Sequence, residues 1–353
     1  MLLLSACGSE KPTKATAECI ATDQVNWTTL LNKNCSQLSQ YGLFLDPSNP
    51  LANTRTPGLP YALNSTLFTD HARKYRYVFI PPNQQADYIE NDSFYFPVGT
   101  VLVKVFTMPA NTSLPEERIL EVRLLIHRTS GWIALPYVWD ETVQDAILDI
   151  NGQNFELSVT HNNVAHTSYY SVPTYAACRT CHSNGQDTVP IGLKARHLNK
   201  AVLYQGESIN QLTLWTNLGL LNNLPHDLSI IDTAPDWQNQ SANLQDRAKA
   251  YLDINCAHCH SDGGAAALSG LRLEYWRKTI DYHHGVCNSA HGWRGGGFDI
   301  WPGDASESAI PKRMAHTTAA DQMPPIGRSL TDQGAVDIIK QWINAMPYDT
   351  CAE

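Results

Sequence analysis

Apolar and polar residues alternate in short runs between about residue 55 and residue 165. A period of two residues places successive side chains on opposite faces of a β-strand. The predicted strands cover residues 75–80, 100–106, 119–126 and 132–139. In the third of them, Glu121 and Arg123 fall on one face and the leucines and valine on the other. Turn signals separate these runs, so the pattern predicts a β-sandwich or barrel.

After about residue 170 the apolar residues recur at helical spacing. Residues 208–215 predict one helix, with Ser208 as its N-cap. Leu244, Ala248, Tyr251 and Leu252 mark a second helix. A third helix, with Thr331 as its N-cap, stops before Pro347, and its apolar positions are Val336, Ile339, Trp342, Ile343 and Met346. The fold class that we predict is therefore β plus α, with an N-terminal β-sandwich-like domain followed by a mainly α-helical region.

The length of the chain indicates several domains, and its negative charge argues against a nucleic-acid-binding function. The chain has 353 residues, which is enough for two or three domains, and its formal net charge is −9. An acidic surface argues against nucleic acid as a partner, because phosphates need a basic face. The same surface suits docking to a basic patch on a redox partner protein.

Two Cys-x-x-Cys-His motifs carry the chemistry, at Cys178 to His182 and at Cys256 to His260. Covalent attachment of haem needs two thiols three positions apart and a histidine directly after them as the proximal iron ligand. The pattern predicts two covalently bound haem c groups, attached through Cys178, Cys181, Cys256 and Cys259, with His182 and His260 as ligands. A zinc site or a thioredoxin-like redox pair is the alternative, but neither requires the histidine.

The sixth ligands follow from the flanking sequence. Met323 precedes two prolines, and a thioether on such a stiff loop is typical of a distal ligand, so we assign it to the second haem, with Met314 as the rival. No methionine lies between the two motifs. His197 is the nearest candidate ligand for the first haem, ahead of an open iron. The other candidates are His127, His161 and His166.

The remaining cysteines indicate an oxidising compartment. Leu4-Ser5-Ala6-Cys7 matches a bacterial lipobox, which predicts a lipid anchor on Cys7 at the periplasmic side of a membrane or at the outer membrane surface. Four cysteines are then left, and their most local pairing is Cys19–Cys35 with Cys287–Cys351.

The C-terminal third resembles a class I cytochrome c domain. The resemblance covers residues 241–347 and rests on four features: the helix leading into the second motif, Trp301-Pro302-Gly303-Asp304, Met323-Pro324-Pro325 and the closing Gln341-Trp342-Ile343. It implies a helical cytochrome c fold.

Over residues 55–347 the chain is also similar to a family of diheme c-type cytochrome lipoproteins of Gram-negative bacteria. The motifs that carry this similarity are Tyr61 to Asp70, Phe96 to Thr100, Gly131-Trp132, Tyr137-Val138-Trp139, and Cys178 to His182 followed by Gly192 and Leu198-Asn199. In that family a β domain precedes the haems, and a parallel β-helix protein is a candidate partner. The resemblance implies architecture more than activity.

We therefore expect an electron carrier that passes single electrons between partner proteins, with no catalytic residue. Two alternatives stay open: a diheme peroxidase-like enzyme with an open first haem, and a β-domain recognition module with the haems as its electron outlet. The predicted segments are a lipobox and tether (1–17), an N-terminal subdomain (18–54), the β domain (55–169), a first haem segment (170–240) and a cytochrome c-like domain (241–353).

Overall fold

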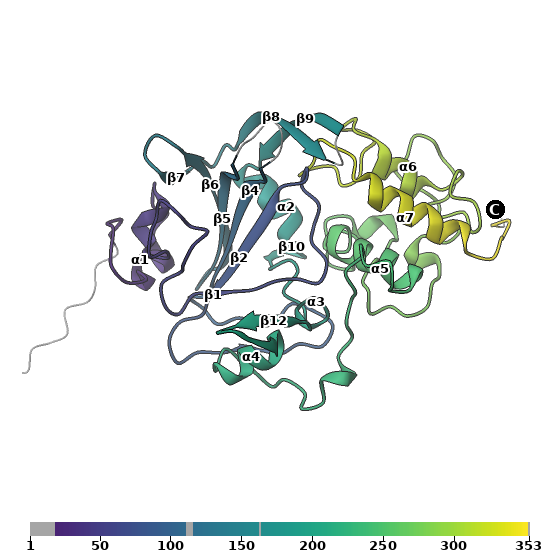
Figure 1. The fold of residues 1–353 in the computed structure, drawn as a ribbon. Helices are drawn as coiled ribbons and strands as arrows, with labels where there is room; N and C mark the ends of the chain where they lie inside the picture. Colours follow the sequence, from purple (N-terminus) through teal and green to yellow (C-terminus); the bar gives the residue numbers. More distant parts are fainter. Residues whose placement is uncertain (1–17, 111–115, 162–163, 352–353) are drawn as a thin grey trace, which may run out of the picture.

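A computed structural model describes residues 18–110, 116–161 and 164–351. The predicted lipid-anchored residue, Cys7, lies outside the described residues. One antiparallel sheet of six strands, in the order β1-β2-β4-β5-β6-β7, forms the centre of the molecule (Figure 1). Its strands are β1 (Leu59–Pro60), β2 (Arg73–Phe79), β4 (Val101–Met108), β5 (Arg118–Arg128), β6 (Gly131–Asp140) and β7 (Asp145–Leu148). The four strands predicted from alternation are confirmed as β2, β4, β5 and β6.

One face of the sheet is covered by the N-terminal residues. Helix α1 (Trp27–Asn32) and the 3-10 turn η1 (Leu38–Tyr41) lie beside it, and the Cys19–Cys35 disulfide ties this segment together. Tyr77, Val103, Val122 and Tyr137 point to this side and are buried with Leu30 and Tyr41 in one core. Burial of these apolar side chains is the main force that holds the segment on the sheet.

Within the described residues, the other face meets no second sheet of more than two strands. It is covered by α2 (Tyr175–His182), by coil, and by two-stranded pairs. These pairs are β8 (Gln153–His161) with β9 (Val164–Val172), β10 (Ser183–Asn184) with β11 (Asp187–Thr188), β12 (Ala201–Tyr204) with β13 (Glu207–Asn210), and β3 (Ala86–Asp87) with β14 (Leu221–Asn222). The predicted β-sandwich or barrel is therefore wrong, since alternation reports that a face is buried but not what buries it.

The C-terminal region is also not mainly α-helical, and that prediction is wrong. It holds α5 (Leu244–Asn255), α6 (Ala309–Ala315) and α7 (Gln333–Asn344), with only the 3-10 turns η3 (Ala267–Ser269) and η4 (Tyr282–His284) between α5 and α6. That long coil turns at glycines with positive φ, such as Gly285 and Gly303, which helices do not accept in their interior. The Cys287–Cys351 disulfide fixes the coil to the end of the chain, so both predicted disulfides are confirmed.

The predicted helices occur at shifted positions. Helix α4 (Gln211–Asn217) begins after Asn210, whose side chain accepts from the backbone N–H groups of residues 212 and 213, because Ser208 belongs to strand β13. Asp332, not Thr331, caps α7. The buried face of α7, with Val336, Ile339, Trp342 and Ile343, agrees with the predicted apolar spacing.

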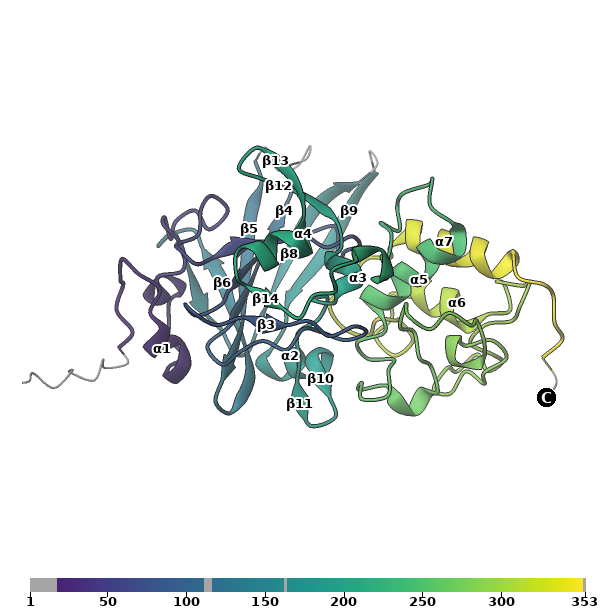
Figure 2. The same cartoon turned by 90° about the horizontal axis from the view of Figure 1, so that it is seen from below.

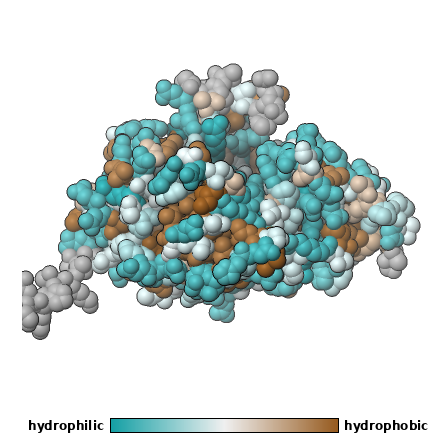
Figure 3. Space-filling view, turned by 60° about the horizontal axis from the view of Figure 1, so that its bottom comes forward, coloured by the Kyte–Doolittle hydropathy of each residue, from teal (hydrophilic) through white to brown (hydrophobic). Residues whose placement is uncertain are grey.

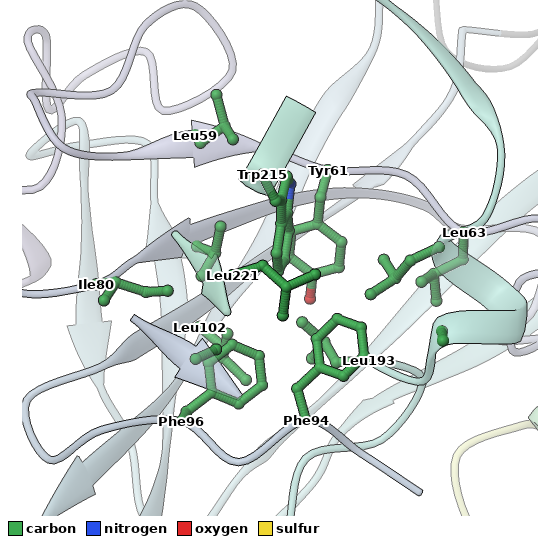
Figure 4. Packing of buried hydrophobic residues seen from close by; sticks show 14 of the residues in the cluster. Leu59, Tyr61, Leu63, Ile80, Phe94, Phe96, Leu102, Leu193, Trp215 and Leu221 are labelled. Atoms are coloured by element: carbon green, nitrogen blue, oxygen red, sulfur yellow. The ribbon is translucent and has the colours of Figure 1, made fainter. Parts of the chain in front are cut away.

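An aromatic core supports the side of the sheet that faces α2. Trp215 of α4 packs edge-on against Tyr61 and Phe94, at ring-centroid distances of 6.0 and 6.4 Å (Figure 4). Leu63 and Leu193 lie at the border of this core. Aromatic and branched side chains that pack as densely as in a crystal form a rigid layer against this face of the sheet.

Among the described residues, no helix is sufficiently long and apolar to span a membrane. Apolar side chains gather in the middle of the face shown in Figure 3, on the side where β12, β13 and α4 lie, and Leu203 and Leu218 are exposed. The C-terminal helices form a separate group beside the sheet (Figure 2).

Candidate functional site

The two Cys-x-x-Cys-His motifs meet at one cavity between the sheet and the C-terminal region. The first motif forms the end of α2, whose N-cap Thr174 accepts from Ala177 N at 3.1 Å. The second motif starts where α5 ends. Cys178, Cys181 and His182 line the cavity together with His258 and Cys259. Cys181 and Cys259 lie close enough to interact, and this interaction together with burial raises the pKa of Cys181 to about 12.

All four motif cysteines are free thiols, whereas the other four described cysteines form disulfides. Burial raises the pKa of Cys256 to about 12, so this thiol stays protonated at neutral pH. The structure therefore separates the cysteines into two classes, as the sequence predicts. Four of the described cysteines form disulfides and four are free thiols.

Both motif histidines are held in the same tautomer. His182 Nδ1 lies 2.7 Å from the Val189 carbonyl oxygen, which can only accept, so Nδ1 carries the proton. His260 Nδ1 lies 2.9 Å from Ser269 Oγ, and that hydroxyl donates to the Ala266 carbonyl, so it accepts from His260. Each ring then presents the lone pair of Nε2, which is the arrangement a metal-ligating histidine needs.

The protonation state of these rings agrees with that role. Burial, with the nearby charge of Lys104, lowers the pKa of His182 to about 3. Burial, together with His258 and Arg313, lowers the pKa of His260 to about 4. Both imidazoles are neutral at pH 7 and able to bind a metal.

The cavity and its donor groups fit a haem. Its wall is mostly apolar, with Leu63, Leu102, Leu125 and Ile254 among the lining side chains. No three His, Cys, Asp or Glu side chains in the described ranges are arranged to hold a metal ion. A c-type haem does not need such a group, because one imidazole and two thiols per motif are sufficient.

Three cationic side chains, Arg76, Lys104 and Arg123, form a row across the strands of the sheet on the face that lines the cavity, and we call them the cation row. Arg76 on β2 is paired in register with Lys104 on β4, and Lys104 is paired with Arg123 on β5. Lys74 lies on the same face, and all four side chains line the cavity. Burial, with Arg76 and Arg123 close by, lowers the pKa of Lys104 to about 7.

The predicted distal ligand Met323 lies in a firmly held loop. Its backbone N–H donates to Arg313 O at 3.0 Å, and its carbonyl accepts from Arg328 Nη2 at 2.9 Å. Pro324, Pro325 and Arg328 line the shared cavity. Met314, the rival, is 6% exposed in the core of the C-terminal region.

Asp70 connects this loop to the β domain. Its carboxylate, 1% exposed, accepts from Ser329 N at 2.9 Å, from Ser329 Oγ at 2.8 Å and from Leu330 N at 2.8 Å. Replacing Asp70 by Ala should destabilise the protein by about 1–3 kcal/mol, since two partly buried backbone donors lose a charged acceptor. Thermal unfolding followed by circular dichroism measures this effect, and an unchanged midpoint would contradict it.

His197 lies apart from the first motif's cavity. It is 1% exposed, and its Nε2 lies 2.5 Å from Asp253 Oδ2 in a buried group with Arg196. It lines a second cavity, which also includes His258. Its role as a haem ligand stays a prediction. Of the other candidates, His127 is stacked on Trp132 at 4.7 Å, with its Nδ1 2.8 Å from Phe96 O.

Sequence reasoning missed two features of the site. His258, inside the second motif, has a buried Nδ1 without a hydrogen-bond partner and lines both cavities. The cation row was visible only as isolated charges in predicted strands, because its alignment depends on strand register.

The comparisons with known proteins add no relative. No protein-family model matches the chain, and searches of curated proteins and of solved structures found no similar protein. The function is therefore inferred from the residues and the geometry of the cavity.

Proposed function

We propose that the protein is a diheme c-type cytochrome that transfers single electrons between partner proteins on the periplasmic side of a membrane. The observation that carries the proposal is that Cys178, Cys181 and His182 of the first motif and Cys259 of the second motif line one largely apolar cavity. In addition, Nδ1 of both His182 and His260 is held by a hydrogen bond, and Nε2 is left to bind iron. The motif resemblance to diheme cytochrome lipoproteins supports the same function.

Each part of the chain then has a defined task. The thiols of Cys178, Cys181, Cys256 and Cys259 attach the two haems, and His182 and His260 are the proximal ligands. Haem iron supplies reversible one-electron chemistry when bound. Val189 and Ser269 fix the imidazole rings, and the apolar wall keeps water from the iron. Cys181 and Cys259 line the same cavity, so the attachment points of the two haems lie close together, which favours electron exchange between them.

A count of attached haems tests the proposal. Protein produced in a host that matures c-type cytochromes should have the polypeptide mass plus two haems after denaturation. Its pyridine haemochrome should give the same number. Replacing Cys178 and Cys181 by Ser should leave one haem, and so should replacing Cys256 and Cys259.

The matched control is the double change of Cys287 and Cys351 to Ser, which removes a disulfide and should leave the count at two. A wild-type mass without any added haem would refute the proposed function.

A further inference from the structure

We infer that the cation row on the sheet binds the propionate carboxylates of the haem attached at Cys178 and Cys181, and so sets its reduction potential. The inference rests on the proposed function, since it needs a haem in the cavity. It gives the β domain a direct part in the redox site, beyond that of a scaffold.

The register of the sheet places like charges side by side. Arg76, Lys104 and Arg123 occupy directly paired positions on β2, β4 and β5, with their side chains on the same face. Directly opposed like charges destabilise an antiparallel sheet. Such a row persists in a folded protein where something of opposite charge offsets the repulsion.

Only one member of the row has a carboxylate partner. Arg123 forms two hydrogen bonds to Glu121, at 2.8 and 2.5 Å, and Glu121 is fully buried. Among the described residues, neither Arg76 nor Lys104 has an ion pair with a carboxylate. Arg76 is 6% exposed, its Nη1 donates to Lys74 O at 3.1 Å, and its buried Nε has no hydrogen-bond partner.

The rest of the wall adds positive charge and no negative charge. Lys74 donates to the Ala72 carbonyl at 3.1 Å, has no carboxylate partner within the described ranges, and also lines the cavity. No Asp or Glu is among the described residues that line it. A buried cation without a carboxylate partner, such as Arg76, is unfavourable beside leucine side chains, so an anionic group in this cavity would stabilise it.

The side chains that line the cavity favour a haem, with its two carboxylates, as the anionic group. A haem is a flat apolar ring with two carboxylates on one edge. The cavity offers leucine and isoleucine side chains on several sides, cations on the sheet side, and the attachment residues on α2. Lys104 and Arg123 line the same cavity as Cys178, Cys181 and His182, so the row and the first motif share one site.

Charge removal from the row tests the inference. Arg76→Gln and Lys104→Met should each lower the equilibrium constant for reduction of one haem by about tenfold, from Coulomb's law at an effective dielectric near 20. A tenfold change is about 59 mV for a one-electron couple, measurable by optical potentiometric titration. Arg76→Lys keeps the charge and should restore most of the potential.

Arg73→Gln is the matched control, because Arg73 is on the same strand but its side chain is 60% exposed. It should leave both potentials unchanged. If two haems are attached but neither Arg76→Gln nor Lys104→Met shifts either potential, the inference fails and the proposed function survives. An equal shift in the Arg73 variant would also overturn the inference. A wild type without attached haem would overturn both.

Discussion

Replacing Asp253 by Ala should lower the free energy of unfolding by about 3–5 kcal/mol, since it leaves a buried arginine without its partner. Asp253 accepts from Arg196 Nη2 at 2.7 Å and Nε at 2.8 Å, from Tyr275 N at 3.1 Å, and contacts His197 Nε2 at 2.5 Å. The side chains of Asp253, Arg196 and His197 are at most 2% exposed. Asp253 lies on α5 just before the second motif, so its loss should also loosen that motif.

The pH dependence of this effect has a definite sign. Burial alone would raise the pKa of Asp253, but Arg196 and His197 outweigh it and hold the pKa well below its usual value. A carboxylate with a depressed folded pKa contributes stability above its unfolded pKa, near 3.9, and loses it as the pH falls through the folded value. The difference between wild type and Asp253→Asn should therefore be constant from about pH 5 to 7 and shrink only below about pH 4.

Urea unfolding followed by circular dichroism measures both effects. Asp232→Ala is the matched control, because Asp232 pairs with Lys278 at 2.7 Å on the surface, where such a pair contributes at most about 1 kcal/mol. Equal losses in the two variants would show that the buried group adds no particular stability.

Features that depend on residues close together in the sequence could be predicted, whereas features that depend on distant residues could not. The Cys-x-x-Cys-His spacing lies within five residues, and strand alternation within eight, so both could be predicted. The two disulfides followed because the most local pairing was also the observed one. The β-sandwich prediction failed because the pattern on 119–126 does not reveal that Arg123 faces a cavity lined by a helix and coil instead of a second sheet.

The C-terminal region shows a second limit. Short motifs such as Trp301-Pro302-Gly303-Asp304 suggested a helical domain, but the chain between α5 and α6 is coil held by backbone hydrogen bonds, such as Leu273 N to His260 O at 3.0 Å. Turns of this kind follow from tertiary contacts, which periodicity does not report. The cation row could not be predicted, because it depends on the register of three paired strands. A shift of one strand by one residue would move its cation to the other face of the sheet.

In the proposed diheme cytochrome, Met323→Ala should convert the second haem from low-spin to high-spin, with loss of its Met–Fe charge-transfer absorption. The loop around Met323 is held by Arg313, Arg328 and, through residue 329, by Asp70, so a thioether there is presented at little entropic cost. Met323→His should keep that haem low-spin and lower its potential, because a thioether ligand raises the potential relative to a second imidazole. The first haem should keep its potential in both variants.

Met314→Leu is the control that separates the two methionines. Met314 is buried in the C-terminal core, and a volume-conserving change there should cost less than about 1.5 kcal/mol and leave the spectrum intact. Near-infrared absorption and potentiometric titration of the purified variants measure spin state, ligand and potential together. If the band persists in Met323→Ala and disappears in Met314→Leu, the distal ligand is Met314, and the loop at 322–330 then serves to close the cavity and not to bind the iron.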